Sequence, residues 1–464
     1  MLYRKIVLSI CLLALASCSS EKPVAKNNAD KKKQEIESEM KNGELNITIN
    51  EDESSAKKFI AEYFSKMPKP VLNKAWVRNN FIPAENLKLN KVPSDYSTVS
   101  IGSKPKRGFE ITSQPIIAEG KIFTLGGQGE FSARKLSDKG EVIWKTILEE
   151  EFLQESRKDY DWLDDVESVF KDKDEFLGGN ICYSRGRVFV STKRGEVYAV
   201  DASSGKLVWK KSLNSPVRSS PVAKNNILVV TTSDSKTYAL NTKTGKRLWM
   251  HEGAEEKAKF VTAPTPLIIG DKVIVSYPSG EVFALNLDDG GEIWMAITSP
   301  DRITQLLPTN NDISYSPIYH NGLIYVVSSN GNIFALQEET GEEIWQLSDM
   351  AIVHSPWPTG DYLFAISRFG QLFAVSSQDG EVIWKTHLAD PKDIDDDNLV
   401  FTPPVIANNN IYVADNEGKL RSYSPRDGKL KKETKIPSNV YQQPAVADGR
   451  IFFVSNKSDL IEIE

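Results

Sequence analysis

The chain has 464 residues, of which 40% are hydrophobic and 26% are charged, and its formal net charge is −6. That composition is ordinary for a globular protein. The negative charge argues against general binding to the phosphate backbone of nucleic acids, which calls for a basic stripe. Three cysteines without CxxC spacing and four scattered histidines argue against a disulfide framework and against a metal site built from these residues.

Residues 1–17 have the organisation of a secretory signal peptide. A short basic region and an apolar stretch at residues 6–16, too short to span a membrane as a stable helix, lead to Leu15-Ala16-Ser17-Cys18. This ending resembles the bacterial lipobox, whose cysteine is diacylated and becomes the new N-terminus. The alternative is an ordinary signal peptide with an incidental Cys18. The resemblance implies a lipid anchor at Cys18, and Ser19 in the next position favours the outer membrane.

Residues 18–56 are polar and charged, with few apolar residues and no sustained periodicity. Such a segment buries too little apolar surface to offset the entropy of ordering it, so we expect a flexible tether. A random chain of this length has a root-mean-square reach of about 35 Å, which would hold the following domain clear of a membrane surface. A short helix is expected over about 55–68, where Phe59, Tyr63 and Phe64 share one face.

The rest of the chain, residues 57–464, is built on an internal repeat. The segments GEVYAVDASSGKLVW (195–209), GEVFALNLDDGGEIW (280–294) and GNIFALQEETGEEIW (331–345) share an alanine, a glycine six residues later and a tryptophan four residues after that. Each copy follows another short run such as GRVFV (186–190). Runs of β-branched and aromatic residues bounded by Gly, Asn and Asp predict antiparallel strands joined by tight turns.

Most of the tryptophans recur at intervals of roughly 40–50 residues, the period of a four-stranded propeller blade. We expect them to be core residues packed between neighbouring blades rather than a platform for stacking a ligand. The expected blade tryptophans are Trp76, Trp144, Trp209, Trp249, Trp294, Trp345 and Trp384. The repeated glycine is expected to turn the chain with a positive φ, and the alanine to lie near the ring axis, where blades crowd.

Seven complete units end at about residues 147, 213, 252, 297, 348, 388 and 436. Residues 441–464 supply only three strands, and the missing outer strand is expected from NKAWVRNN (73–80), with Trp76 at the repeat's tryptophan position. Pairing of an N-terminal strand with the last blade closes the ring and removes its open edges. The predicted fold is therefore all-β: an eight-bladed propeller of four-stranded antiparallel blades over residues 57–464.

Three segments depart from the repeat, and loops on a rigid scaffold commonly carry function. Residues 149–178 form an acidic insertion, which is either a solvated excursion or a partner-binding element. The loop 299–314 makes an interface hot spot, unless its leucines fold back onto the blade. The candidate partner-binding residues of this loop are Arg302, Leu306 and Leu307. The acidic loop 390–398 lacks the alternating spacing and the glycine of a calcium loop, so we expect no metal there.

No nucleophile motif, P-loop or dinucleotide fingerprint occurs in the sequence. The repeat resembles that of quinoprotein (PQQ-type) propellers, and it is specific for the fold but not for quinone binding. The PQQ-dependent alcohol dehydrogenases are similar in fold. Activity of their kind would need a pair of adjacent cysteines over the cofactor and a calcium held by acidic and amide side chains. Cys182 stands alone in the predicted propeller. We therefore expect no cofactor and no enzyme activity of that kind.

The lipobox, the tether and eight such repeats with nothing appended resemble the plan of the BamB family, lipoprotein subunits of the outer-membrane β-barrel assembly machinery. The ending TPPVIANNNIYVADNEGKLRSYSPRDGKL…QQPAVADGRIFFVSNKSDL is also similar to that family's last two blades. The resemblance implies a non-catalytic scaffold, held in the outer membrane by its lipid and facing the periplasm. It also implies two kinds of partner: the periplasmic domains of the barrel-forming (BamA-like) subunit and unfolded outer-membrane proteins.

The resemblance further implies a contact surface made of a Leu/Arg-bearing loop between the fourth and fifth blades and an acidic pair in the sixth. Arg302, Leu306 and Leu307 occupy the first place without the family's spacing, and Arg368 in SRFG (367–370) occupies the second without the acidic pair. Two hypotheses of different classes stay open on the sequence. One is the assembly scaffold, and the alternative is a PQQ-like dehydrogenase or ligand-binding propeller of the envelope.

Overall fold

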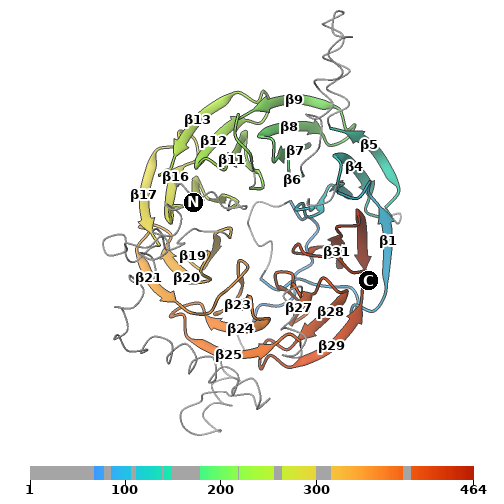
Figure 1. Ribbon diagram of the computed structural model, residues 1–464, viewed down its shortest axis with the longest axis vertical. Helices are drawn as coiled ribbons and strands as arrows, with labels where there is room; N and C mark the ends of the chain where they lie inside the picture. Colours follow the sequence, from blue (N-terminus) through green and yellow to red (C-terminus); the bar gives the residue numbers. More distant parts are fainter. Residues whose placement is uncertain are drawn as a thin grey trace, which may run out of the picture. The chain divides into compact units, whose positions relative to one another are not determined.

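The computed structural model describes residues 67–77, 85–105, 111–137, 140–148, 178–217, 219–254, 264–298, 315–389 and 399–464. These residues form eight four-stranded antiparallel sheets, which stand as blades around one ring (Figure 1). We label the four strand positions of a blade A to D, from the innermost strand to the strand at the rim. The seven complete units end where the sequence predicts them, and the eight-bladed all-β fold is confirmed.

Blades 1 to 4 each take their strands, in the order A to D, from one stretch of chain. Blade 1 is β2 (Ile116–Ala118), β3 (Lys121–Leu125), β4 (Glu130–Lys135) and β5 (Val142–Ile147); blade 2 is β6 (Gly179–Ser184), β7 (Arg187–Thr192), β8 (Glu196–Asp201) and β9 (Leu207–Ser212); blade 3 is β10 (Val222–Lys224), β11 (Ile227–Thr231), β12 (Lys236–Asn241) and β13 (Arg247–Glu252); blade 4 is β14 (Leu267–Ile269), β15 (Lys272–Ser276), β16 (Glu281–Asn286) and β17 (Glu292–Ile297).

Blades 5 to 7 follow the same order, and blade 8 combines the two ends of the described chain. Blade 5 is β18 (Ile318–His320), β19 (Leu323–Val327), β20 (Ile333–Gln337) and β21 (Glu343–Leu347); blade 6 is β22 (Trp357–Thr359), β23 (Tyr362–Ile366), β24 (Gln371–Ser376) and β25 (Val382–His387); blade 7 is β26 (Val405–Ala407), β27 (Asn410–Ala414), β28 (Lys419–Tyr423) and β29 (Leu430–Lys435); blade 8 is β30 (Ala445–Ala447), β31 (Arg450–Val454), β32 (Asp459–Ile463) and, as its D strand, β1 (Tyr96–Ser100).

An N-terminal strand closes the ring, but it is not the strand that the sequence predicts. β1 pairs antiparallel with β32, from Tyr96 opposite Ile463 to Ser100 opposite Asp459. Trp76 instead forms an isolated antiparallel bridge with Ile117 in the innermost strand of blade 1, so its predicted place at the rim of blade 8 was wrong. The physical reason is burial: the residues of β1 are mostly exposed, whereas Trp76 is buried and stacks on Trp357 with ring centroids 6.5 Å apart.

The other six predicted tryptophans lie on D strands and pack against the next blade, as expected. Each indole covers the glycine of the next blade's C–D turn, and its Nε1 donates to a backbone carbonyl of that turn; Trp249, for example, donates to the Leu287 carbonyl at 2.8 Å. The pairs are Trp144–Gly205, Trp209–Gly245, Trp249–Gly290, Trp294–Gly341, Trp345–Gly380 and Trp384–Gly428. All six glycines have φ between 65° and 77°. The glycine therefore both turns the chain and leaves room for the indole.

The repeated alanine lies on strand C and not near the axis, so that expectation was wrong. Ala199 and Ala239 are fully buried and lie directly opposite Trp209 and Trp249 on the neighbouring D strands, beside a β-bulge. Residues opposite each other in an antiparallel pair project from the same face of the sheet. A larger side chain would compete with the indole for the space between two blades.

Hydrophobic clusters fill the spaces between neighbouring blades. Cys182 is buried in the cluster between blades 2 and 3. The largest cluster spans blades 6, 7, 8 and 1, and it takes in Trp76, Leu87 and Leu89 from the N-terminal part of the chain. These three residues therefore belong to the core of the propeller.

Residues 67–77 and 85–95 form a strap that crosses one face of the ring before the chain enters β1 (blue trace in Figure 1). The strap contacts the A–B turns of successive blades: Gly360 N–H donates to Glu85 Oε2 at 2.7 Å, Asn408 N–H to the Leu87 carbonyl at 2.8 Å, and Asn90 N–H to the Gly449 carbonyl at 2.9 Å. We call this the strap face. Because the strands of a blade alternate in direction, the B–C turns and the D–A connections lie on the opposite face, which we call the connection face.

Several predicted segments lie outside the described residues. They are the signal segment, the tether, residues 149–177 of the acidic insertion and the acidic loop 390–398; only the last two residues of the helix expected over 55–68 are described, and they are not helical. In the part of the chain that the structure describes, no helix has the length and apolar character needed to cross a membrane.

Candidate functional site on the connection face

The structure places one of the four predicted partner-binding residues. Each of the three departures from the repeat joins a D strand to the next A strand, and the described ends of such connections lie on the connection face. Arg302, Leu306 and Leu307 lie outside the described residues. Arg368 lies in the B–C turn of blade 6, between β23 and β24, and therefore also belongs to the connection face.

The turn that carries Arg368 presents a cation and an aromatic ring side by side. Phe369 is 54% exposed, and the Arg368 guanidinium carbon lies 6.0 Å from the centre of its ring. The backbone of the turn is fixed, because Arg368 N–H donates to the Ala351 carbonyl at 2.9 Å. Exposed aromatic and arginine side chains are enriched among the residues that dominate protein–protein binding energy.

Sequence reasoning missed Phe369, although the repeat contains a signal for it. The equivalent turns in blades 2 and 5 read TKRG (192–195) and SSNG (328–331), whereas blade 6 reads SRFG (367–370). A large apolar side chain at the tip of a turn has no packing role in the repeat. Comparing the turns of the copies, rather than their strands, identifies it.

Three successive connections contact one another in this region through aromatic side chains. Tyr315, at the described end of the connection between blades 4 and 5, meets His354 edge to face with centroids 6.2 Å apart. His354 in turn donates from Nε2 to the Phe401 carbonyl at 2.8 Å, which joins the next connection. Burial raises the pKa of Tyr315, while the nearby Arg368 cation opposes that rise. Burial lowers the pKa of His354 to about 4, so the imidazole is neutral near pH 7.

A series of hydrogen bonds between polar residues joins the segments that lead into the innermost strands of neighbouring blades on the same face. The Ser220 N–H donates to Thr265 Oγ1 and the Thr265 N–H to Ser316 Oγ, both at 3.0 Å, and Ser355 Oγ donates to the Ser316 carbonyl at 2.8 Å. Each of these residues directly precedes the proline that opens a repeat unit. The bonds link blades 3, 4, 5 and 6, so the exposed turn of blade 6 stands on a rigid support.

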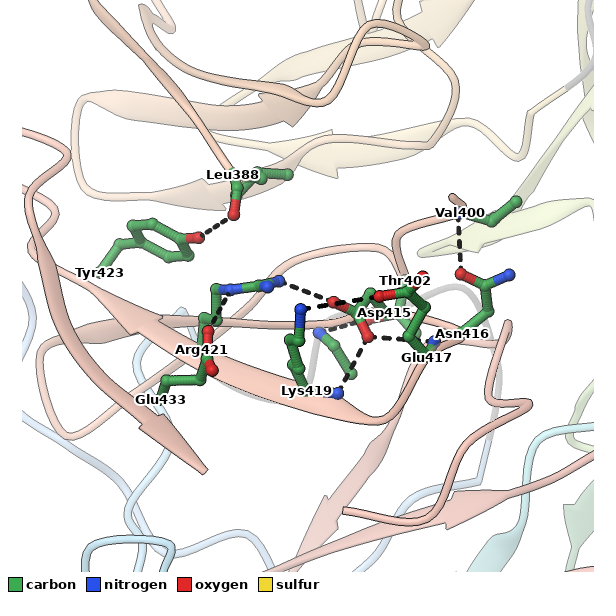
Figure 2. Close-up of polar contacts among 11 residues, drawn as sticks. Leu388, Val400, Thr402, Asp415, Asn416, Glu417, Lys419, Arg421, Tyr423 and Glu433 are labelled. Atoms are coloured by element: carbon green, nitrogen blue, oxygen red, sulfur yellow. Dashed lines mark hydrogen bonds and ion pairs between the residues drawn. The ribbon is translucent and has the colours of Figure 1, made fainter. Parts of the chain in front are cut away.

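Blade 7 departs from the repeat by burying a charged network (Figure 2). Arg421, on β28, donates from Nη1 to Asp415 Oδ2 and from Nε to Glu433 Oε2, both at 2.8 Å. Asp415 is fully buried, and its Oδ1 also accepts the backbone N–H groups of Glu417 and Lys419. Burial acts to lower the pKa of Arg421, but the two carboxylates outweigh it and raise that pKa. The arginine is therefore held as a cation inside the blade.

The same part of blade 7 holds both described ends of the connection from blade 6 (Figure 2). The Tyr423 hydroxyl donates to the Leu388 carbonyl at 2.8 Å on one side of residues 390–398. On the other side, Val400 N–H donates to Asn416 Oδ1 and Ala414 N–H to Thr402 Oγ1, both at 3.0 Å. The ion pair of Asp415 and Arg421 thus stabilises the turn that anchors this connection.

The distinctive features of the connection face are exposed turns and irregular connections. In the described part of the chain, no group of three or more His, Cys, Asp or Glu side chains is placed to hold a metal ion. The residues that stand out are an exposed aromatic–arginine turn and the described ends of long connections. Loops and turns on a rigid scaffold are the parts of a protein that most often carry its function.

Comparison with known proteins decides the family. The sequence profile of the family described as "Outer membrane protein assembly factor BamB" matches residues 134–386 and 397–464. The chain belongs to the BamB family. The matched residues include the strands of blades 2 to 8 apart from β1 and the last residue of β25, so the assignment rests on the whole repeat and not on a single motif.

Individual relatives are distant. An uncharacterized protein of Rickettsia conorii is 28% identical over 239 residues, and because these cover 51% of this chain and 53% of the relative, the match spans about half of each protein. The BamB outer membrane protein assembly factor of Yersinia pestis is 24% identical over 320 residues, 68% of this chain and 75% of that protein. These identities carry no residue-level correspondence for the exposed turns.

Solved structures agree on the fold. The crystal structure of BamB from Moraxella catarrhalis is similar with a TM-score of 0.63, at 17% identity, over 80% of this chain and all of that one. A quinohemoprotein alcohol dehydrogenase from Comamonas testosteroni is similar with a TM-score of 0.59, at 13% identity, over 89% of this chain and 82% of that one. Likeness at such identities shows a shared propeller and says nothing about chemistry.

Proposed function

We propose that this protein is a non-catalytic, lipid-anchored scaffold of the machinery that assembles outer-membrane β-barrel proteins. In this proposal it faces the periplasm, binds the periplasmic part of the barrel-forming subunit and assists the insertion of unfolded barrel proteins. The observation that carries the proposal is membership of the BamB family, through a profile match that extends over blades 2 to 8. The name of the Yersinia pestis relative, an outer membrane protein assembly factor, supports the same role.

The connection face supplies a surface for the proposed partner. Arg368 and Phe369 present a charge and an exposed ring on a turn whose backbone is fixed. We propose that this turn contacts the barrel-forming subunit, together with Arg302, Leu306 and Leu307 of the connection from blade 4. Tyr315 ends that connection and lies close enough to Arg368 for the cation to affect its pKa. The described end of that connection therefore lies beside the Arg368 turn.

The alternative, a PQQ-dependent dehydrogenase, is favoured only by the shared propeller. The residues present do not fit the cofactor, because the described residues hold no group suited to a metal ion and Cys182 is buried without a neighbouring cysteine. Trp76 and the strap also pack against the innermost strands, where the Trp76 ring stacks on Trp357. Incubation with PQQ and Ca²⁺ tests this alternative. Tight binding with dye-linked oxidation of an alcohol would overturn the scaffold proposal.

Affinity purification of the acylated protein from outer membranes tests the proposed function directly. We expect the barrel-forming subunit to copurify, and its absence under conditions that keep the assembly machinery intact would contradict the proposal. A Cys18→Ala variant is the matched control for the anchor. We expect it to fold, because residue 18 is remote in sequence from the propeller, but to appear in the soluble periplasmic fraction. Retention of that variant in the membrane would refute the lipid anchor.

A further inference from the structure

The strap face carries exposed lysines at one edge of the ring. Lys69, Lys74, Lys88 and Lys91 of the strap are all exposed, and so are Lys429 and Lys431 at the rim of blade 7. Their partners are few: Lys91 Nζ lies 3.6 Å from Glu464, Lys429 Nζ lies 3.4 Å from Asp427, and Lys431 Nζ donates to Asn410 Oδ1 at 2.8 Å. Exposed carboxylates lie here too, among them Asp95, Glu433, Asp448 and Glu464, but the six lysines outnumber these four, in a chain whose net charge is −6.

Large apolar side chains are exposed among these lysines. Val71 is 53% exposed, Leu72 is 40%, Val92 is 60%, and Leu430 at the rim of blade 7 is 54%. Such side chains cost free energy in water and gain it at the boundary between headgroups and acyl chains. An interleaved set of lysines and apolar residues is the composition of surfaces that dock on anionic membranes.

Hydrogen bonds bring these residues together on one side of blades 7 and 8. Val71 N–H donates to the Asn86 carbonyl at 2.9 Å and Lys88 N–H to the Val71 carbonyl at 2.8 Å, so the two parts of the strap run side by side. Asn86 also donates to Asn409 of blade 7, the residue next to the Asn410 that binds Lys431. Lys432, at the rim, donates to the Pro93 carbonyl at 2.8 Å. The lysines of the strap and of blade 7 therefore lie in one band, which runs from above the innermost strands to the rim and which we call the edge at blades 7 and 8.

The opposite side of the strap face, at blades 4 and 5, carries acidic turns, whereas the C–D turns of blades 2 and 3 carry exposed Lys206, Lys243 and Lys246. The C–D turns of blades 4 and 5 carry Asp288, Asp289, Glu338 and Glu339 on this same face. An anionic membrane would repel these turns and attract the edge at blades 7 and 8. Charge therefore excludes the side at blades 4 and 5, and the place where the chain enters the propeller favours the edge at blades 7 and 8 over the lysines of blades 2 and 3.

The chain enters the propeller at this edge. Pro68, one residue after the start of the described strap, accepts a hydrogen bond of 2.7 Å from Asn86, which itself contacts blade 7. The proposed acylation site Cys18 lies 49 residues upstream of Met67 in the sequence. The strap is therefore the part of the propeller that is connected most directly to the proposed anchor.

We infer that the basic and apolar edge formed by the strap and the rim of blade 7 docks on anionic phospholipid headgroups of the leaflet that holds the proposed lipid anchor. The inference rests on the anchor at Cys18 but not on the identity of the protein partner. Docking there leaves the connection face, with Arg368 and Phe369, directed away from the lipid. Each lysine close to an anionic surface contributes about 1 kcal/mol, or roughly fivefold in the ratio of docked to undocked protein.

A fluorescent reporter tests the docking in the acylated, full protein. Cys182 is fully buried and Cys18 is acylated, so a Val92→Cys variant can be labelled selectively. The labelled protein is placed in vesicles of phosphatidylcholine, with or without phosphatidylglycerol, that carry a headgroup quencher. We expect quenching of the Val92 reporter only when phosphatidylglycerol is present, with a decrease at high salt. A Phe369→Cys reporter on the connection face should stay unquenched.

Charge-reversal variants provide the matched comparison. The triple variant Lys88→Glu, Lys91→Glu and Lys431→Glu should lower the docked-to-undocked ratio by about a hundredfold or more. The control triple variant Lys206→Glu, Lys243→Glu and Lys246→Glu makes the same change in net charge at exposed turns of blades 2 and 3 on the same face, and should dock normally. All six positions are exposed, so unchanged melting temperatures will verify the fold.

Three results would overturn the inference. The first is an unquenched Val92 reporter in both kinds of vesicle, and the second is equal loss of quenching in the two triple variants. The third is quenching that appears only after the purified periplasmic part of the barrel-forming subunit is added, which would assign the edge to a protein. Failure of the protein to float with any vesicle would instead refute the anchor at Cys18, and this result is separable because it precedes the reporter reading.

Discussion

Substitution of one repeat glycine tests how the blades are joined. Gly205 lies in the C–D turn of blade 2 with φ +74°, and a Cβ built on it would lie 2.6 Å from Cε3 of Trp144 in blade 1. Gly186 lies in the A–B turn of the same blade with φ +76°, and a Cβ there would meet no atom within 4 Å. The variants Gly205→Ala and Gly186→Ala therefore share the backbone strain and differ only in the contact with the tryptophan.

The structure sets the size of the difference. A non-glycine residue in the left-handed region costs about 1–2 kcal/mol, offset by about 0.4–1 kcal/mol from the reduced freedom of the unfolded chain, and both variants pay it. Overpacking a filled contact costs a further 1–3 kcal/mol, roughly. If the indole moves away instead, it loses the 3.1 Å hydrogen bond from Nε1 to the Ala202 carbonyl, worth about 1 kcal/mol. We expect Gly205→Ala to be the less stable variant by about 2 kcal/mol.

Scanning calorimetry of the two variants beside the parent protein measures that difference. For a domain of about 400 residues, 1 kcal/mol corresponds to about 1 °C in the melting temperature, so Gly205→Ala should melt about 2 °C below Gly186→Ala. A Trp144→Leu substitution should reduce the gap, because neighbouring sites that share a contact are not additive. Equal melting temperatures for the two alanine variants would refute the account of the tryptophan–glycine junction.

Three further predictions concern the core, the charged network and pH. Arg421→Met leaves the fully buried Asp415 without its cationic partner and should lower the free energy of unfolding by about 3–5 kcal/mol. The double variant Arg421→Phe with Asp415→Ser, which copies the residue types of blade 6, should recover most of this loss in urea unfolding. Equal losses of stability in the two variants would contradict the ion-pair account. Trp76→Ala should cost about 3–5 kcal/mol and shift the emission of the remaining tryptophans as Trp357 is uncovered, and unaltered stability would place Trp76 outside the core. The pKa of His354 is lowered to about 4 in the folded state, below its ordinary value of 6.5, so its contribution to stability is complete above about pH 6.5 and is lost as the pH falls towards 4. A His354→Gln variant should remove about 3 kcal/mol of that pH dependence, and an unchanged profile between pH 4 and 6.5 would assign the dependence to other groups.

The blades themselves could be predicted from the sequence because every copy of the repeat carries the same pattern of strands and turns. The glycine, the tryptophan and the strand patterns recur with one spacing, and the ends of seven blades followed from them. The D strand of blade 8 could not be found in that way. β1 reads YSTVS, carries no tryptophan and lies at an exposed rim, so only its pairing with β32 identifies it.

The strap could not be predicted for a related reason. Its order comes from contacts with residues more than 200 positions later, such as Glu85 with Gly360 and Leu87 with Ile406. Local sequence periodicity cannot predict contacts between residues so far apart in the chain. The role of Arg368 in partner binding stays a prediction. The exposed ring of Phe369 beside it could not be predicted from the strand pattern, because the repeat constrains the buried strand residues and leaves the tips of the turns free to vary. Departures from a repeat are informative at turns as well as in long insertions.

Direct binding between the purified acylated protein and the purified periplasmic part of the barrel-forming subunit tests the central claim. The account predicts measurable affinity for the parent protein, a loss of about 10- to 100-fold for the double variant Arg368→Glu with Phe369→Ala, and no loss for the triple variant Lys206→Glu, Lys243→Glu and Lys246→Glu on the strap face. Calorimetric titration at matched salt would give all three values. Absence of binding by the parent protein, or equal affinity of the parent and the Arg368–Phe369 variant, would contradict the scaffold function or its site respectively.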